Sequence, residues 1–222
     1  MRARDERGLL WRLCSRLVWA GLRLAFRLRT AGTSFVPSSG PAVLAANHVS
    51  ALDGVALAAV VSERRRRVVR FLVAAEFFRR RAVGWALRRF RQIPVRRGAR
   101  DVGALEEAVS TVRRGALAGI FPEGTVNPGA GLLPGRPGVA RIALAAHVPV
   151  LPVGIWGTQL RWPRSGLHLR RPWRPPLSVV VGPPIEPQGD PTVEADVAAF
   201  VGRVMDGIAR QVEAARALAE AR

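Results

Sequence analysis

The sequence predicts an α/β protein in which a largely parallel central sheet is covered by helices on both faces. The first observation behind this prediction is that short apolar runs alternate along the chain with longer segments of helical periodicity. Alternation of this kind is typical of parallel strands joined by crossover helices, and such strands are buried on both faces. The second observation is composition, because 222 residues, 49% of them apolar, are enough for one well-buried core.

The expected elements follow one another in a regular order after an N-terminal helix over Leu9–Phe26. A turn-rich stretch, Thr30–Pro41, separates that helix from the remaining chain. Buried strands are expected where apolar residues run together, at Ala42–Ala46, Arg70–Ala74, Gln92–Val95, Ala116–Phe121, Val148–Ile155 and Leu177–Val181. Helices are expected between and after these strands, at Ala51–Ser62, Arg81–Phe90, Val102–Arg113, Arg136–Ala146 and Thr192–Ala219.

The N-terminal helix is amphipathic, with arginines on one side and mainly leucines and tryptophans on the rest of its surface. Arg12, Arg16, Arg23 and Arg27 fall within roughly 60° of one another on a helical projection. These charges interrupt the apolar run too often for a membrane-spanning helix or a signal peptide. The pattern predicts a helix lying in the plane of a membrane; the alternative is a helix packed on the protein's own core. We expect residues 1–32 to form this membrane-associating segment and residues 33–222 to form the main domain.

The net charge of +19 comes from arginine alone, since the sequence contains no lysine. A field of this sign attracts polyanions, which include anionic lipid and nucleic acid. Aromatic residues are few, at 6%, and no recognition-helix or RNA-binding signature is present, so a non-enzymatic nucleic-acid-binding protein is only a remote alternative. Cys14 is the single cysteine, and neither His147 nor His168 has partners at metal-ligand spacing. We therefore expect no internal disulfide and no metal site.

The most informative segment runs from a buried strand through a polar loop into a helix and contains His48 and Asp53. Ser50 stands where a helix N-cap would, and Asp53 follows three residues later, a spacing that resembles a capping box. Because His48 lies in the loop and Asp53 in the first helical turn, their side chains can converge. A carboxylate that binds one imidazole nitrogen fixes the tautomer and leaves the other nitrogen as a base. A purely structural histidine is the alternative interpretation.

A second segment, Gly119–Thr125, again leads from a buried strand into a tight loop. Glycine permits close backbone approach, and Glu123 follows the carboxyl end of the strand. Open α/β sheets bind their ligands at that edge, where His48 also lies at the end of its own strand. A simple strand-ending turn is the alternative.

Four blocks of sequence, in their order and spacing, resemble the glycerolipid acyltransferase family, in particular its bacterial 1-acylglycerol-3-phosphate acyltransferases. The first block is matched by Asn47–Asp53 and the second by Gln92–Gly98. The third is matched by Phe121–Thr125 and the fourth by Val148–Val153.

The resemblance implies an O-acyltransferase that moves a fatty acyl group directly from acyl-CoA or acyl-carrier protein to a lysophospholipid hydroxyl. The implied acceptor is foremost 1-acylglycerol-3-phosphate, which would give phosphatidic acid. His48 would act as the general base, and Asp53 would orient it and stabilise its imidazolium. No cofactor is implied beyond the thioester co-substrate.

The resemblance also implies substrate-binding residues. Arg97 matches the second-block arginine that contacts the acceptor phosphate, and a guanidinium can grip phosphate through two hydrogen bonds. Glu123, Gly124 and Thr125 match the acceptor site of the third block, and Pro152 matches the fourth block, which shapes the acyl-donor or catalytic pocket. Arg96 is expected to add positive charge beside Arg97, and Asn47 and Ser50 are expected to support the loop or an oxyanion.

Two positions depart from the family pattern. Val126 stands where the family often has arginine after the third-block threonine, and Arg96 stands where it usually has aspartate. The first departure keeps open an alternative acceptor, such as a glycolipid or another hydroxylated lipid. The expected partners are an anionic membrane surface, a lysolipid and the acyl donor, with no nucleic acid. The expected location is the cytoplasmic face of the cell membrane, peripheral or monotopic.

Overall fold

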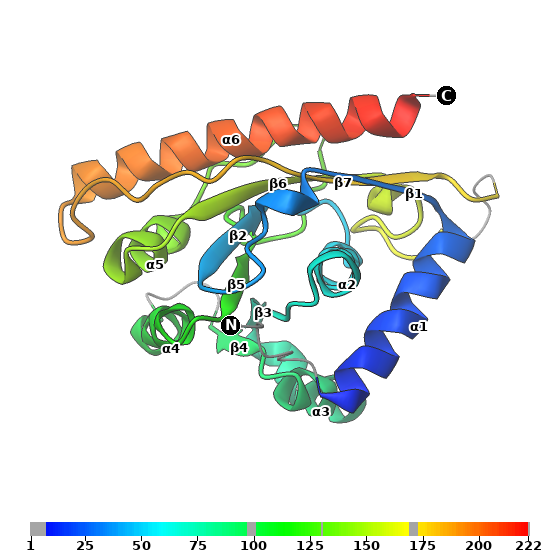
Figure 1. Ribbon diagram of the computed structural model, residues 1–222, viewed down its shortest axis with the longest axis horizontal. Coiled ribbons are helices and arrows are strands. Elements are labelled where there is room, and N and C mark those ends of the chain that lie inside the picture. Colours follow the sequence, from blue (N-terminus) through cyan, green and yellow to red (C-terminus); the bar gives the residue numbers. More distant parts are fainter. Residues whose placement is uncertain (1–7, 97–100, 130, 169–172, 222) are drawn as a thin grey trace.

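The computed structural model describes residues 8–96, 101–129, 131–168 and 173–221 and contains a seven-stranded sheet with helices on both faces (Figure 1). The strand order is β1-β7-β6-β2-β5-β3-β4, and every neighbouring pair is parallel except β6 and β7. The strands are β1 (Arg27–Ala31), β2 (Ala42–Ala46), β3 (Val69–Ala74), β4 (Ile93–Val95), β5 (Leu117–Ile120), β6 (Val150–Trp156) and β7 (Pro176–Val181). The predicted α/β class is confirmed.

Helices cover the sheet in two groups, each with its own apolar core. The α-helices are α1 (Leu9–Ala25), α2 (Asp53–Arg65), α3 (Arg81–Arg89), α4 (Val102–Arg113), α5 (Gly138–Ala146) and α6 (Glu194–Glu220). Short 3-10 turns are η1 (Thr33–Phe35), η2 (Ala75–Arg79) and η3 (Thr158–Leu160). One core joins α1 and α2 to the sheet, and the other joins α4, α5 and α6 to its opposite face.

Strand β2 shows why the sequences of the central strands are unbroken runs of apolar residues. Leu44 and Ala46 face the core beneath α1 and α2, whereas Val43 and Ala45 face the core beneath α4 to α6. All of these side chains are fully buried. A parallel strand with a helix layer on each face has no solvent side, so polar residues do not alternate along it.

Strand β1 was missed by the sequence analysis, which expected a turn-rich stretch from Thr30. β1 is an edge strand that pairs with β7 from Arg27, opposite Pro176, to Ala31, opposite Val180. Its residues RLRTA are exposed or half-buried, so it lacks the apolar run that marks the buried strands. Helix α2 was also expected too early, since Ala51 and Leu52 form a turn and the helix begins at Asp53.

Helix α1 presents two different apolar faces. One face packs on α2, where Leu22 is buried, Trp11 Nε1 donates to Ser62 Oγ at 3.0 Å and Ser15 Oγ donates to Glu63 Oε1 at 3.1 Å. The other face leaves a row of leucines 50–73% exposed, namely Leu9, Leu13, Leu17 and Leu24. Within the described part of the chain, no helix is long and apolar enough to cross a membrane. Packing on α2 therefore accounts for only one of the two apolar faces of this helix. Its position at a membrane stays a prediction.

Candidate active site

The candidate site lies at the carboxyl ends of the central parallel strands. β2 and β5 are neighbours, and the loop after each carries a residue that the sequence singled out, His48 and Glu123. Parallel neighbours deliver their following loops to the same edge of a sheet. The two loops are joined there, because the backbone N–H of His48 donates to Glu123 Oε1 at 2.8 Å.

His48 and Asp53 form a hydrogen-bonded pair at this edge. His48 Nδ1 lies 3.0 Å from Asp53 Oδ2, and the aspartate is fully buried while the histidine side chain is 16% exposed. The same Oδ2 accepts from the backbone N–H groups of Val49 at 2.7 Å and Ser50 at 2.8 Å. A carboxylate oxygen that only accepts hydrogen bonds favours the tautomer with the proton on Nδ1, and in that neutral tautomer Nε2 holds the lone pair.

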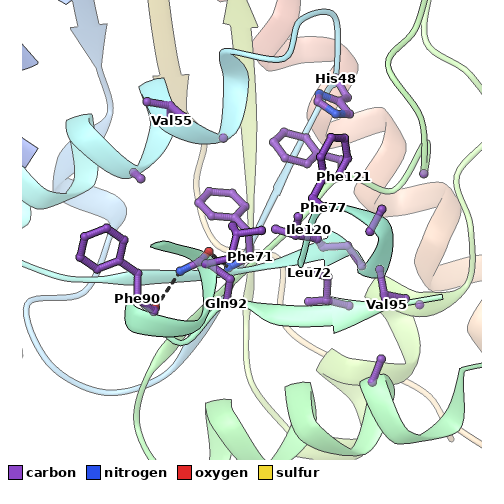
Figure 2. A pocket seen from close by; sticks show the side chains of 18 of the residues that line it. His48, Val55, Phe71, Leu72, Phe77, Phe90, Gln92, Val95, Ile120 and Phe121 are labelled. Carbon is purple, nitrogen blue, oxygen red and sulfur yellow. Dashed lines mark hydrogen bonds between the residues drawn. The ribbon is translucent and has the colours of Figure 1, made fainter. Parts of the chain in front are cut away.

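Stacking fixes the plane of the imidazole. The His48 ring lies on Phe121 with centroids 4.1 Å apart and planes 17° from parallel, and Phe121 stacks in turn on Phe71 at 5.7 Å. Figure 2 shows His48 above Phe121 at one end of the pocket. The hydrogen bond to Asp53 and the stacking on Phe121 together fix the orientation of the ring, and so the direction in which Nε2 points.

Asn47 and Ser50 brace the loop that carries His48. The buried Asn47 amide donates to the Ile155 carbonyl at 3.0 Å and accepts from its N–H at 2.8 Å, which ties the end of β2 to β6. Ser50 Oγ donates to the Trp162 carbonyl at 2.6 Å and accepts from Leu52 N–H at 3.1 Å. Half of the expected capping box is present: Asp53 reaches back to the Ser50 N–H, but α2 begins at Asp53 itself.

Thr158 is a part of this site that the sequence analysis missed. It is fully buried in η3 after β6, and its hydroxyl donates to Asp53 Oδ1 at 2.6 Å. The other carboxylate oxygen already serves His48 and two backbone N–H groups, so Thr158 completes the hydrogen bonding of the aspartate. The two residues are 105 positions apart, and only the place of Thr158 just after a buried strand could have drawn attention to it.

Glu123 holds the loop together from within the protein. It is 3% exposed; besides His48 N–H on Oε1, its Oε2 accepts from Asn127 Nδ2 at 2.7 Å and from Leu133 N–H at 3.0 Å. The backbone N–H of Asn127 also donates to the His48 carbonyl at 2.6 Å, so Glu123, Asn127 and His48 are hydrogen-bonded to one another. With both oxygens occupied, Glu123 holds the backbone at His48 in place, and its direct contact with an acceptor stays a prediction.

Replacing Glu123 with glutamine tests this bracing. Glutamine replaces one carboxylate oxygen by an NH₂ group. Whichever way the amide is turned, this NH₂ group faces at least one N–H donor that has lost its acceptor. We expect Glu123→Gln to lower the free energy of unfolding by about 1–3 kcal/mol, the cost of unsatisfied buried polar groups. Chemical denaturation measures the change, and Glu106→Gln, on the exposed surface of α4, serves as the matched control. Equal stability of the two variants would contradict the bracing role.

A large apolar cavity opens beside His48. Its volume is about 1040 Å³, and α1, α2, α3, β3, β4 and α4 contribute side chains to its wall. Figure 2 shows Phe71 and Phe90 farther from His48 along this cavity. Trp11 of α1 also lines it and meets Phe90 edge-on with ring centroids 4.9 Å apart. An apolar space that ends at the polar His48–Asp53 pair suits a ligand with a long hydrocarbon part.

The remaining predicted residues divide between the cavity and other places. Gly124 and Arg96 line the cavity, and Thr125 is half-buried in the loop after Gly124. Arg97 lies outside the described residues. Pro152 is not brought to the cavity: it is buried in β6 and faces α6, where a Cβ added at Gly207 would lie 3.0 Å from the Pro152 Cβ.

Asp101 fixes the position of Arg96 at the cavity rim. Its carboxylate accepts from the backbone N–H groups of Arg96 and Ala104, and the Arg96 guanidinium lies 3.5 Å away. The backbone hydrogen bonds, chiefly that from Arg96, together with the nearby positive charge, hold the pKa of Asp101 below its usual range. Because a lowered pKa favours the ionised form, this cap of α4 is fully formed at neutral pH and weakens only as the pH falls through that lowered pKa.

Comparison with known proteins relates this chain, and the region that holds the site, to a protein family. A model of the family described as Acyltransferase matches residues 27–156, which span β1 to the end of β6 and include His48, Asp53 and Glu123. The chain belongs to the acyltransferase family. The predicted resemblance is therefore confirmed at the level of the family, and the matched region contains the candidate site.

Two plant relatives and one solved structure are named for acylglycerophosphate acyltransferase activity. A chloroplastic 1-acyl-sn-glycerol-3-phosphate acyltransferase of Brassica napus is 29% identical over 64% of this chain and 41% of its own length. One from Limnanthes alba is 38% identical over 39% of this chain and 30% of its own length, so the chain spans less than half of these plant relatives. The crystal structure of the 1-acyl-sn-glycerophosphate (LPA) acyltransferase of Thermotoga maritima matches with a TM-score of 0.70 and 25% identity. That match covers 93% of this chain and 79% of the other.

Proposed function

We propose that this acyltransferase moves a fatty acyl group from an acyl thioester to the free hydroxyl of a lysophospholipid. The acceptor is foremost 1-acylglycerol-3-phosphate, and the product is phosphatidic acid. The observation that carries the proposal is the His48–Asp53 pair at the end of the apolar cavity, with Nδ1 held at 3.0 Å and Nε2 left as the base. The names of the plant and Thermotoga maritima relatives support the same acceptor.

The geometry supports a direct transfer in one chemical cycle. His48 Nε2 takes the proton of the acceptor hydroxyl as its oxygen attacks the thioester carbonyl carbon. The C–O bond forms, the C–S bond breaks, and the imidazolium returns the proton to the leaving thiolate. Asp53 stays ionised and stabilises the imidazolium across the 3.0 Å hydrogen bond. Neither a covalent acyl-enzyme nor a cofactor is required; acyl-CoA or acyl-carrier protein is the co-substrate.

A second acceptor class shares this chemistry. Val126 stands in place of the arginine common in the family, and it lines the cavity beside Gly124. An apolar side chain there favours a neutral acceptor, such as a glycolipid or another hydroxylated lipid, over a phosphate at that position.

A panel of acceptors tests the proposed function and separates the two classes. Purified protein is mixed with acyl-CoA or acyl-carrier protein thioester and with single lysolipids in vesicles, and the products are identified by mass. We expect diacylated phosphatidic acid from 1-acylglycerol-3-phosphate. A product formed only from neutral acceptors would favour the second class, and no product from any acceptor would contradict acyl transfer.

The exposed face of α1 supports a position at a membrane surface, which we propose is the cytoplasmic face of the cell membrane. The side chains of Leu9, Leu13, Leu17 and Leu24 are unburied, with exposed arginines next to them along the helix. Leucines insert at the boundary of the hydrocarbon layer, and arginines bind the phosphates of anionic lipids. The opposite face of the same helix carries Trp11 into the cavity, so a membrane-bound α1 would place the cavity near its lipid substrates.

Charge placed on the exposed leucines tests the membrane contact. The double variant Leu13→Asp/Leu17→Asp is expected to bind vesicles containing anionic lipid at least about tenfold more weakly, because two exposed leucines can no longer insert into the lipid. Vesicle sedimentation measures the affinity. Ala214→Asp/Ala217→Asp adds the same charges to an exposed face of α6 and should bind nearly as well as the wild type. Unchanged binding by the leucine variant would remove α1 from the membrane contact.

A further inference from the structure

Three arginines line the cavity, and their ionic partners differ. Arg141 forms an ion pair with Glu194, and Arg96 Nε lies 3.5 Å from Asp101 Oδ2. Within the residues that the structure describes, the Arg136 guanidinium has neither a hydrogen bond nor a carboxylate partner. Arg136 is therefore the cavity cation whose charge is not already used inside the protein.

Arg136 is held against the loop that supports His48. Its backbone N–H donates to the Pro122 carbonyl at 2.9 Å, and Gly124 N–H donates to the Phe121 carbonyl at 2.9 Å in the same turn. A Cβ at Gly124 would lie 2.5 Å from Arg136 Nε and 2.9 Å from Cζ, so the guanidinium packs directly on this glycine. Gly124 also has a backbone φ of +68°, which residues with a side chain rarely adopt. The absence of a side chain at position 124 thus makes room for Arg136.

The place of Arg136 suits an anionic headgroup beside the catalytic base. The turn on which it packs begins at Phe121, whose ring stacks on His48 at 4.1 Å. Val126, which lacks the arginine common at its position in the family, lines the same cavity. The planar guanidinium presents paired N–H donors that match two phosphate oxygens, and the apolar wall around it strengthens such a contact.

We propose that Arg136 binds the phosphate of the acceptor lysolipid and takes over the task that an arginine at position 126 would perform. The ligand class is a phosphomonoester with a free hydroxyl, bound with the phosphate on Arg136 and the hydroxyl toward His48. This inference rests on the proposed acyl transfer and narrows its acceptor, because Val126 then no longer argues for a neutral lipid.

Acceptor kinetics of Arg136→Gln test the assignment. We expect the KM for 1-acylglycerol-3-phosphate to rise about 10–100-fold, as for a lost charged hydrogen-bond pair, with little change for a neutral monoacylglycerol. Arg141→Gln is the matched control: the same change at an arginine in the same cavity that is already paired with Glu194. Its KM for the phosphate acceptor should stay within about threefold of the wild type.

A second variant tests the replacement itself. Val126→Arg added to Arg136→Gln is expected to lower the raised KM again about tenfold, since it restores a guanidinium to the same wall. A KM unchanged by Arg136→Gln, or raised equally by Arg141→Gln or for both acceptors, would overturn the binding role. A KM that stays raised in the double variant would overturn the claim that Arg136 takes over from position 126.

Direct binding separates this inference from the proposed function. Dissociation of 1-acylglycerol-3-phosphate from wild type and Arg136→Gln is measured by calorimetry in detergent without any acyl donor. Weaker binding by the variant supports the phosphate site even if no acyl product forms, in which case only the proposed transfer fails. Equal binding overturns the phosphate site while leaving acyl transfer to be decided by its own products.

Discussion

His48→Ala is expected to lower the rate of acyl transfer by about 10²–10⁴-fold, the range typical of a lost general base. The histidine supplies the nitrogen lone pair at the end of the cavity, with Nδ1 committed to Asp53 at 3.0 Å and the ring stacked on Phe121. Alanine removes the base but leaves the backbone free to keep the hydrogen bond from His48 N–H to Glu123. The measurement is kcat for phosphatidic acid formation in vesicles at saturating acyl donor.

A second histidine provides the matched control for this variant. His168 lies in the loop after β6, where Nε2 is 3.2 Å from Ser165 Oγ, and His168→Ala is expected to leave kcat within about threefold of the wild type. Thermal unfolding of both variants confirms that the fold is kept. Wild-type turnover by His48→Ala would contradict the general-base mechanism.

Asp53→Asn is expected to have the second largest effect, a fall in kcat of about 10²–10⁴-fold. Asparagine can keep much of the local geometry, because its oxygen can accept from Val49 and Ser50 while its NH₂ donates to the hydroxyl oxygen of Thr158. It removes the negative charge that, in the proposed mechanism, stabilises the imidazolium during proton transfer. The variant therefore separates the charge of residue 53 from its structural part.

The control for Asp53→Asn is Asp206→Asn on the exposed surface of α6. Similar melting temperatures of the two variants show that the effect on turnover comes from the site. Turnover by Asp53→Asn equal to that of Asp206→Asn would mean that the carboxylate charge plays no part in the reaction.

The sequence predicted most of the sheet because its inner strands are buried on both faces. β2 was found at Ala42–Ala46 and α4 at Val102–Arg113 with the bounds that the structure shows. β1 was not found, since an edge strand of sequence RLRTA has neither an apolar run nor a regular alternation. Its position depends on pairing with β7, which lies about 150 residues later in the chain, as the register from Arg27 to Pro176 shows.

In the candidate site, as in the sheet, contacts between residues close in sequence were predicted and contacts between distant residues were not. The approach of His48 to Asp53 was predictable because both residues belong to one strand–loop–helix segment. Thr158 and Arg136 were not predicted as parts of the site, since tertiary packing alone brings them to Asp53 and Gly124. The sequence did not predict the hydrogen bonds that occupy both oxygens of Glu123, because they come from Asn127, Leu133 and the distant backbone of His48.

Helix α1 shows that two interpretations of one pattern can concern different faces of a helix, and the membrane interpretation stays a prediction. Its tryptophan and serine side, with Trp11 and Ser15, packs on α2, as the core alternative predicted. Leu13 and Leu17 remain half or more exposed, as a membrane helix requires. An apolar helical arc too wide for one contact is therefore compatible with two contacts, one to the protein and one to lipid.

The most direct test follows thiol release and lipid product in the same vesicle sample, with 1-acylglycerol-3-phosphate and an acyl thioester whose chain differs in mass from that of the acceptor. We expect one thiol for each molecule of mixed-chain phosphatidic acid in the wild type and the loss of both in His48→Ala. Thiol release that continues without lipid product, or equal product from His48→Ala, would contradict transfer by the His48–Asp53 pair.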